Sequence, residues 1–316
     1  MKNGSVIIAL GGNALSRRDE AGTIYQQFAQ TRHSLEAIMH FIRQDYNICL
    51  IHGNGPQVGD ELHRMELTHT QISPLPLGVC VAGTQGTIGY MIQQSLQNAL
   101  YDAEIDREVV TLITQVVVDR DDPSIQNPTK FIGQSYSKEK AQNLAKKFGW
   151  TIGEQNPGEW RQVVPSPLPQ FVMHGKSIKT LVDHGIIVLA AGGGGIPAFL
   201  DEQGHLEGLD AVIDKDLAAA LLGRVIKARE LWIITDVDYV YRDFGTDRET
   251  PIKEIGTEEL KQLDREGQFQ EGSMRPKIQA ALYFLKYHGE KVVITSIPRV
   301  LQALQGESGT IIRKTK

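Results

Sequence analysis

Cysteine is scarce in this sequence. Only Cys49 and Cys80 occur among 316 residues, which excludes a disulfide framework and leaves no four-ligand zinc set. This cysteine use fits a reducing cytoplasm, and we expect both thiols to be small buried hydrophobes.

Long apolar runs and surplus positive charge are also missing. The longest uncharged apolar stretch, residues 185–200, is broken by four consecutive glycines and a proline, and it is shorter than the roughly 18 apolar residues of a spanning helix. Residues 1–10 lack a cleavage pattern, so we expect a first strand there. The net charge is −5, from 33 Lys and Arg against 38 Asp and Glu. Membranes and nucleic acids are therefore not expected partners.

The remaining composition, 41% hydrophobic and 22% charged, is typical of a compact protein with one large lobed unit or two domains. Short β-branched runs alternate with longer helical patterns, which predicts an α/β fold with a parallel sheet. The predicted helices cover residues 28–42, 84–100 and 277–288, with Pro276 near the start of the last. The predicted strands cover residues 6–10, 47–51, 109–117, 186–190, 231–235, 292–295 and 310–313.

Residues 119–169 break this alternation. They hold six of the 13 prolines and a single helix candidate, residues 138–148. Because a structureless loop of this length is uncommon in a compact body, we expect an inserted small projecting subdomain with a functional role.

Glycines gather where strands are predicted to end. Thirteen of the 31 glycines fall in four clusters, and three clusters directly follow strand candidates. The carboxyl ends of parallel strands share one rim, where glycine lets backbone N–H groups approach an anion. A phosphate cradle is the functional interpretation, and tight turns are the structural alternative. The clusters are residues 11–12, 53–59, 78–89 and 192–195.

Familiar phosphate and hydrolase motifs do not fit. The glycines of residues 53–59 have one residue too many for the dinucleotide fingerprint, and no acidic residue lies between Glu66 and Asp102. Gly175-Lys176-Ser177 lacks the earlier glycine of a P-loop. No metalloprotease or serine-hydrolase motif occurs either.

Lysines and aspartates accompany the glycines. Residues 213–216 open one predicted helix and residues 272–277 open another, and a helix start favours anions. A lysine there can stabilise a migrating phosphoryl group, and an aspartate can hold that lysine or a magnesium ion. Ordinary surface charge remains the alternative.

A series of short stretches, in order along the chain, resembles the carbamate kinases of the amino-acid kinase family. The stretches are residues 9–14, 52–59, 85–90, 127–130, 163–167, 192–197, 211–216, 235–237 and 272–274. The resemblance implies a three-layer αβα sandwich with about eight strands and a homodimer. It also implies reversible phosphoryl transfer between ATP and carbamate with Mg²⁺, giving ADP and carbamoyl phosphate. The usual direction makes ATP, as in arginine or purine breakdown.

The resemblance also implies roles for individual residues. Residues 1–218 would form the carbamate and phosphoryl lobe, and residues 219–316 the nucleotide lobe. Lys215 and Lys277 would contact the transferring phosphate, and Asp216 would orient these two lysines. Lys130 would contact the small substrate, and Asp214 is a weak candidate for a metal ligand. The substrate loops would supply Gly11, Gly12, Asn13, Gly53, Asn54 and Gly55. The nucleotide would contact Thr235, Asp236, Val237, Tyr241, Met274, Pro276 and Lys277.

Two positions depart from the family pattern, and other functions stay open. Phe131 replaces the usual proline, and Gln162 replaces a common arginine. Both changes affect the projecting subdomain more than the phosphate site.

His52 could act as a base, although a structural histidine is favoured, because carbamate already carries a negative oxygen. Another amino-acid kinase, for a larger carboxylate or UMP, and a non-catalytic nucleotide-binding protein are the alternatives.

Overall fold

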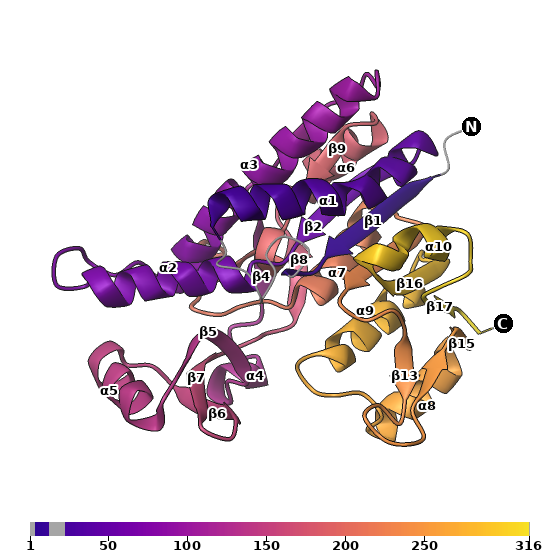
Figure 1. The fold of residues 1–316 in the computed structure, drawn as a ribbon. Coiled ribbons are helices and arrows are strands. Elements are labelled where there is room, and N and C mark those ends of the chain that lie inside the picture. Colours follow the sequence, from indigo (N-terminus) through magenta and orange to yellow (C-terminus); the bar gives the residue numbers. More distant parts are fainter. Residues whose placement is uncertain (1–3, 13–22, 316) are drawn as a thin grey trace.

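A sheet of eight strands forms the centre of the computed structural model, which describes residues 4–12 and 23–315 (Figure 1). The strand order is β15-β17-β16-β12-β1-β2-β9-β3, and only β16 and β17 pair antiparallel. The predicted α/β class with a mainly parallel sheet is confirmed. The strands are β1 (Ser5–Leu10), β2 (Asn47–His52), β3 (Val109–Thr111), β9 (Ile187–Leu189), β12 (Glu230–Thr235), β15 (Glu254–Gly256), β16 (Lys291–Ser296) and β17 (Thr310–Arg313).

Helices cover both faces of this sheet. In β1, Ile7 and Ala9 join one hydrophobic core, whereas Val6, Ile8 and Leu10 join the other, because successive side chains of a strand point to opposite faces. Burial on both faces explains why the strand sequences are continuous apolar runs. The first core packs on α6 (Gly175–Asp183), α7 (Lys215–Ile226), α8 (Thr257–Arg265) and α9 (Met274–Lys286), and the second on α1 (Ile24–Arg43), α3 (Leu77–Asp102) and α10 (Val300–Leu304).

The predicted helices and most predicted strands are present. Helix α1 contains residues 28–42 and α3 contains residues 84–100. Helix α9 begins at Met274, earlier than predicted, with Pro276 in its first turn, where a missing N–H costs no helical hydrogen bond. Within the described residues, no helix is both long and apolar enough to span a bilayer.

The prediction of one strand over residues 109–117 is wrong. The chain leaves the central sheet after β3 and enters a second sheet as β4 (Gln115–Val118). Between them, the Gln85 side chain accepts from the Thr114 N–H at 2.8 Å and donates to the Thr114 carbonyl at 3.1 Å. The Gln85 amide thus satisfies the backbone hydrogen-bonding groups of Thr114 at the break. The β-branched run is continuous in the sequence, but it forms two separate strands in the structure. The second sheet has the order β11-β10-β4-β8, with β8 (Pro169–Val172), β10 (Ile196–Leu200) and β11 (Leu206–Gly208).

The elements between β4 and β8 form a small subdomain that projects below the central sheet in Figure 1. The predicted helix is present as α5 (Lys138–Phe148), capped by the Ser137 hydroxyl. Beside it lies an antiparallel sheet of order β5-β7-β6 that was not predicted, because its strands are too polar and exposed to show an apolar pattern. Its elements are α4 (Pro123–Gln126), β5 (Lys130–Tyr136), β6 (Ile152–Asn156) and β7 (Glu159–Val164).

Candidate active site

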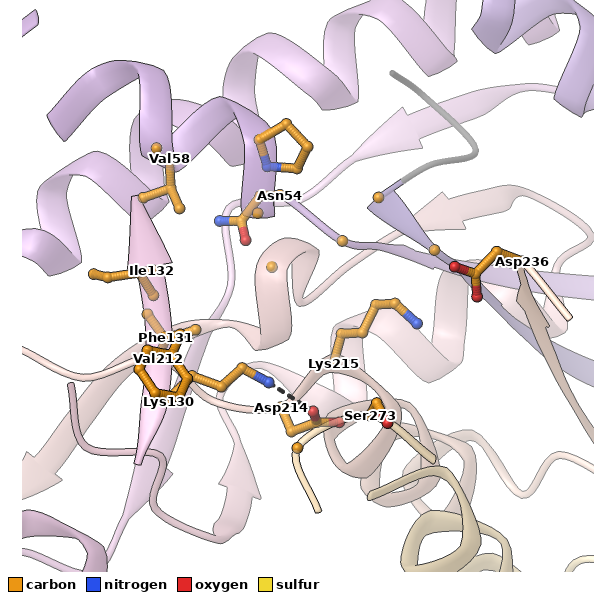
Figure 2. A pocket seen from close by; sticks show the side chains of 18 of the residues that line it. Asn54, Val58, Lys130, Phe131, Ile132, Val212, Asp214, Lys215, Asp236 and Ser273 are labelled. Atoms are coloured by element: carbon orange, nitrogen blue, oxygen red, sulfur yellow. Dashed lines mark hydrogen bonds and ion pairs between the residues drawn. The ribbon is translucent and has the colours of Figure 1, made fainter. Parts of the chain in front are cut away.

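One cavity of about 970 Å³ opens at the carboxyl ends of the central strands. The loops after β1, β2, β9 and β12 line it, together with the start of α7 and strand β5 of the projecting subdomain. Figure 2 shows side chains from these separate elements facing the same space. Of the predicted substrate-loop residues, Gly11, Gly12, Gly53, Asn54 and Gly55 line the cavity. Asn13 lies outside the described residues.

The glycine loops pack too closely for side chains. A Cβ on Gly53 would lie 3.0 Å from the Gly12 nitrogen. Gly193 has φ +68°, and a Cβ there would lie 2.3 Å from the Asn54 amide nitrogen. Gly193, in the short 3₁₀ segment η2 (Gly192–Gly194), also lines the cavity. This glycine cluster is visible in the sequence, but none of its residues was predicted to be in the site.

Asn54 connects these loops to two helices. Its amide nitrogen donates to the Thr84 hydroxyl of α3 at 2.9 Å, and its backbone precedes α2 (Gly55–Thr68). Asn54 is buried, and its side chain caps no backbone N–H of α2. The start of α2, where Gly55 lines the cavity, therefore keeps N–H groups that no Asn54 side chain caps, and such a helix start favours an anion.

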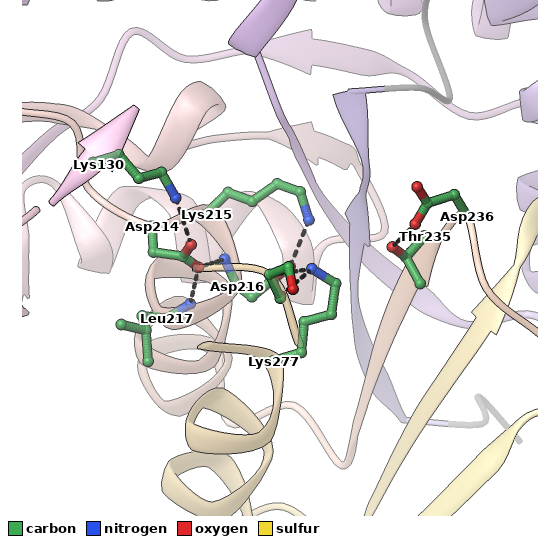
Figure 3. Close-up of polar contacts among 9 residues, drawn as sticks. Lys130, Asp214, Lys215, Asp216, Leu217, Thr235, Asp236 and Lys277 are labelled. Atoms are coloured by element: carbon green, nitrogen blue, oxygen red, sulfur yellow. Dashed lines mark hydrogen bonds and ion pairs between the residues drawn. The ribbon is translucent and has the colours of Figure 1, made fainter. Parts of the chain in front are cut away.

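Two lysines converge on one buried carboxylate (Figure 3). The Lys215 ammonium lies 2.5 Å from Asp216 Oδ1, and the Lys277 ammonium lies 3.2 Å from Asp216 Oδ2. Lys277 also donates to the Ser273 carbonyl at 3.1 Å. Asp216 is 2% exposed, whereas both lysines keep part of their surface in the cavity. One carboxylate thus fixes two positive charges at a cavity wall.

Electrostatics keep this group charged. Burial alone would raise the pKa of Asp216, but the charges of Lys215 and Lys277 lower it well below its usual range. Burial would lower the pKa of Lys277, and the negative charges of Asp216 and Asp214 raise it instead. The carboxylate and the Lys277 ammonium are therefore both ionised near pH 7. Their arrangement suits an anion that carries several negative oxygens.

Asp214 and Lys130 form an ion pair that lines the cavity on the side of the projecting subdomain. Asp214 caps α7 by accepting from the backbone N–H groups of Asp216 at 2.9 Å and Leu217 at 3.4 Å. Its second oxygen lies 3.0 Å from the Lys130 ammonium. Lys130 begins β5, so the projecting subdomain places this charge at the cavity, and its contact with the small substrate stays a prediction.

The geometry offers Asp214 little room as a metal ligand. Both of its oxygens already accept hydrogen bonds, and no three acidic, histidine or cysteine side chains in the described part of the chain gather to hold a metal ion. A magnesium ion would therefore fit best when carried by phosphate oxygens, which it binds readily while keeping several waters.

The predicted nucleotide residues divide into two groups. Thr235 and Asp236 line the cavity beside Lys277, and the Thr235 hydroxyl donates to the Asp236 carboxylate at 3.0 Å. The other members do not line this cavity: Val237, Tyr241, Met274 and Pro276. Tyr241 instead lies on the hairpin of β13 (Val240–Arg242) and β14 (Thr250–Ile252), next to Tyr239 and Phe244.

His52 is enclosed behind the glycine loops. It is 2% exposed, and its Nδ1 donates to the Gly53 carbonyl at 3.0 Å. Burial lowers the pKa of His52 to about 4, opposed by that hydrogen bond. The ring is thus neutral near pH 7 and supports the loop backbone, as favoured from the sequence. Cys49 and Cys80 are buried with reduced thiols, also as expected.

The projecting subdomain contributes cavity residues that the sequence analysis did not place in the site. Arg161 lines the cavity, and its guanidinium donates to the Gln155 side chain at 2.8 Å. From the sequence, its neighbour Gln162 was singled out and Arg161 was not. Other lining residues missed there are Gln134, Ser135, Asn156, Glu159 and, after β16, Ile297 and Pro298.

Comparison with known proteins agrees with this geometry. A sequence model described as the amino acid kinase family matches residues 4–296. The chain is 43% identical to a carbamate kinase from Pyrococcus horikoshii over 307 residues, which cover 96% of this chain and 98% of that protein. A carbamate kinase from Trichomonas vaginalis is 42% identical, with 97% and 98% covered.

A solved structure shows the same fold. The carbamate kinase from Giardia lamblia bound to AMP-PNP superposes with a TM-score of 0.92 at 36% identity, and all of both chains is covered. The family model, the relatives and the solved structure each match nearly the whole chain. The chain therefore belongs to the amino acid kinase family and, within it, to the carbamate kinases.

Proposed function

We propose that this protein transfers a phosphoryl group reversibly between ATP and carbamate, giving ADP and carbamoyl phosphate. The observation that carries the proposal is the pair Lys215 and Lys277, held by Asp216 at the wall of the glycine-lined cavity. Relatives over nearly the whole chain are named carbamate kinases, and the Giardia lamblia enzyme binds the ATP analogue AMP-PNP.

The chemistry needs position and charge more than a protein nucleophile. A carbamate oxygen attacks the γ-phosphorus, the new oxygen–phosphorus bond forms, and the bond to the ADP oxygen breaks. Lys215 and Lys277 would neutralise the negative oxygens of the transferring group. Backbone N–H groups of the glycine loops after β1 and β2 would bind it, other than those of Gly11 and Gly53, which donate to the Ile234 and Leu10 carbonyls. Carbamate is already an anion, so no general base is required, in agreement with the neutral, enclosed His52.

The two substrates would enter from different sides. We assign carbamate to the side of Lys130 and Asn54, because both line the cavity and Lys130 belongs to the projecting subdomain. ATP would bind as its magnesium complex beside Thr235 and Asp236, with its base toward Val237, Tyr241, Met274 and Pro276. Residues 1–218 would then form the carbamate lobe and residues 219–316 the nucleotide lobe.

A homodimer is proposed as the working assembly. Strand β3 ends the sheet order among the described strands, and an exposed edge offers unpaired backbone groups to a second copy. Beside it lies a groove of about 560 Å³ on α3, where Tyr90 is 57% and Ile113 is 55% exposed. Light scattering should give twice the mass of the chain, and Tyr90→Glu should shift it toward a monomer. A monomeric wild type would exclude this assembly.

The physiological direction would be ATP formation in the cytoplasm. Carbamoyl phosphate from the breakdown of amino acids such as arginine, or of purines, would serve as the phosphoryl donor. The shared reaction chemistry does not distinguish among these sources.

A coupled assay of ATP formation from ADP and carbamoyl phosphate tests the proposal. Removing one preorganised contact to the phosphoryl group costs roughly 3–4 kcal/mol at the transition state, so Lys215→Ala and Lys277→Ala should each lower turnover at least about a hundredfold. Near-normal turnover in either variant would remove that role. A substrate panel with larger carboxylates and UMP decides between related kinases, and ADP binding without turnover would indicate a regulatory protein.

A further inference from the structure

One face of α2 runs along the projecting subdomain for most of the helix. Gly59, Leu62, Glu66 and His69 recur every three or four residues, so they share this face. A Cβ on Gly59 would lie 3.4 Å from the Cα of Gly133 in β5. The subdomain is therefore attached to α2 along a line and not only through its two connections to the main body.

Apolar packing and an aromatic contact hold the two ends of this line. Leu62 and Ile132 belong to one buried hydrophobic cluster. At the far end, the His69 ring meets the Phe148 ring of α5 edge-on, with centroids 5.3 Å apart. These contacts fix the separation between α2 and the subdomain, but apolar packing specifies the register of β5 along α2 less sharply than directional hydrogen bonds do.

Glu66 supplies the directional contact between them. Its Oε2 accepts from the Tyr136 hydroxyl at 3.0 Å, and its Oε1 lies 3.3 Å from the Lys140 ammonium of α5. His63, one turn earlier on α2, also contacts Oε2 at 3.0 Å. The Glu66 side chain is 11% exposed, and the Lys140 ammonium lies 4.8 Å from the centre of the Tyr136 ring.

This cluster keeps the carboxylate ionised. Burial would raise the pKa of Glu66, but hydrogen bonds from His63, Tyr136 and Lys140 and the positive charge of Lys140 lower it below its usual value. A charged acceptor strengthens each of these hydrogen bonds relative to a neutral one. The contact is therefore strong and directional, although Glu66 does not line the cavity.

The contact lies at the end of β5 away from Lys130, one residue beyond the last cavity-lining residue of the strand, Ser135. Strand β5 starts with Lys130, which faces Asp214 at the cavity, and finishes with Tyr136, which binds Glu66. Helix α2 also starts at the cavity, with Gly55. Helix and strand thus run outward together, and Glu66 joins them about 17 Å along the helix.

We propose that Glu66 is a positioning residue that fixes β5 against α2 and thereby holds Lys130 over the carbamate end of the cavity. The proposal rests on the proposed function for its kinetic consequences only. Its structural content, that Glu66 attaches the projecting subdomain to α2, is measurable without turnover.

Kinetics of Glu66→Ala give the first test, with Glu61→Ala as a matched control. Glu61 lies on the same helix, but its ion pair is with Arg64 of that helix and does not reach the subdomain. Glu66→Ala should raise the KM for carbamoyl phosphate roughly tenfold, the size expected when charged hydrogen bonds are lost, and leave the KM for ADP within about twofold. Glu61→Ala should change neither.

The second test asks whether Glu66 acts through Lys130. In a Lys130→Met background, Glu66→Ala should cause little further increase in the KM for carbamoyl phosphate, because the group that it positions has been removed. Tyr136→Phe removes only the hydroxyl and should reproduce most of the Glu66→Ala effect. A full additional tenfold effect in the Lys130→Met background would overturn the proposed route.

Hydrogen exchange tests the attachment of the subdomain to α2 without requiring enzyme turnover. Amides of residues 130–148 should exchange faster in Glu66→Ala and Tyr136→Phe than in wild type, with α7 unchanged. Unchanged exchange in both variants would refute the attachment, whatever the enzyme's substrate is. Faster exchange in an enzyme that makes no ATP would support the attachment while rejecting the proposed function.

Discussion

Replacing Asp216 by asparagine gives the sharpest test of the charge arrangement. The substitution keeps the size of the side chain and removes one negative charge that is 2% exposed and contacts two ammonium groups. Removing one partner of a buried ion pair costs about 3–5 kcal/mol. Lys215 and Lys277 are 14% and 16% exposed, so water compensates part of this loss and we expect about 3 kcal/mol.

The same loss should appear in catalysis. Without the Asp216 charge, the Lys215 and Lys277 ammonium groups repel each other. The pKa of Lys277 also falls, because the negative charge that raises it most has been removed. If about 3 kcal/mol of transition-state stabilisation is lost, turnover falls roughly 150-fold, since each 1.36 kcal/mol is a factor of ten. The coupled ATP-formation assay measures turnover, and urea denaturation measures the free energy of unfolding.

Glu230→Gln serves as the matched control. Glu230 begins β12, at the end of the strand opposite to the cavity, and it pairs with Lys291 at 2.9 Å while 16% exposed. This variant should lose stability yet keep turnover within about twofold. If Asp216→Asn were as active as Glu230→Gln, the idea that one carboxylate organises two catalytic lysines would be wrong.

Two further predictions concern Lys130 and His52. Lys130→Met should raise the KM for carbamoyl phosphate at least tenfold with little change for ADP, and equal effects on both substrates would contradict its assignment. For His52, the folded pKa of about 4 lies below the ordinary 6.5, so the unfolded state binds more protons between these values. The free energy of unfolding should therefore fall toward pH 4, by up to about 1.36 kcal/mol per pH unit. His52→Gln should flatten this dependence in urea denaturation, and an unchanged slope would contradict the shift.

The sequence predicts the central sheet well because its strands are buried on both faces. Continuous apolar runs such as β1 and β12 have few other interpretations. The break after β3 was missed, because it depends on an amide from Gln85, which is distant in sequence and satisfies the backbone of Thr114. The strands of the projecting subdomain were missed for a different reason, since half-exposed polar strands carry little periodicity.

The residues of the candidate site were also only partly predictable from local sequence patterns. Lysines at helix starts indicate an anion site, so Lys215 and Lys277 were identifiable as candidates. Their convergence on the opposite oxygens of Asp216 is a tertiary fact that no local pattern contains. The pairing of Glu66 with Tyr136, 70 residues apart, is another. Arg161 carries no local signal beyond its charge, and only the fold places it in the cavity.

A structure with ADP and magnesium bound tests the central claim most directly. We predict that the terminal phosphate lies within hydrogen-bond distance of the Lys215 and Lys277 ammonium groups and beside the glycine loops. A diphosphate held elsewhere in the cavity, away from both lysines, would contradict the account.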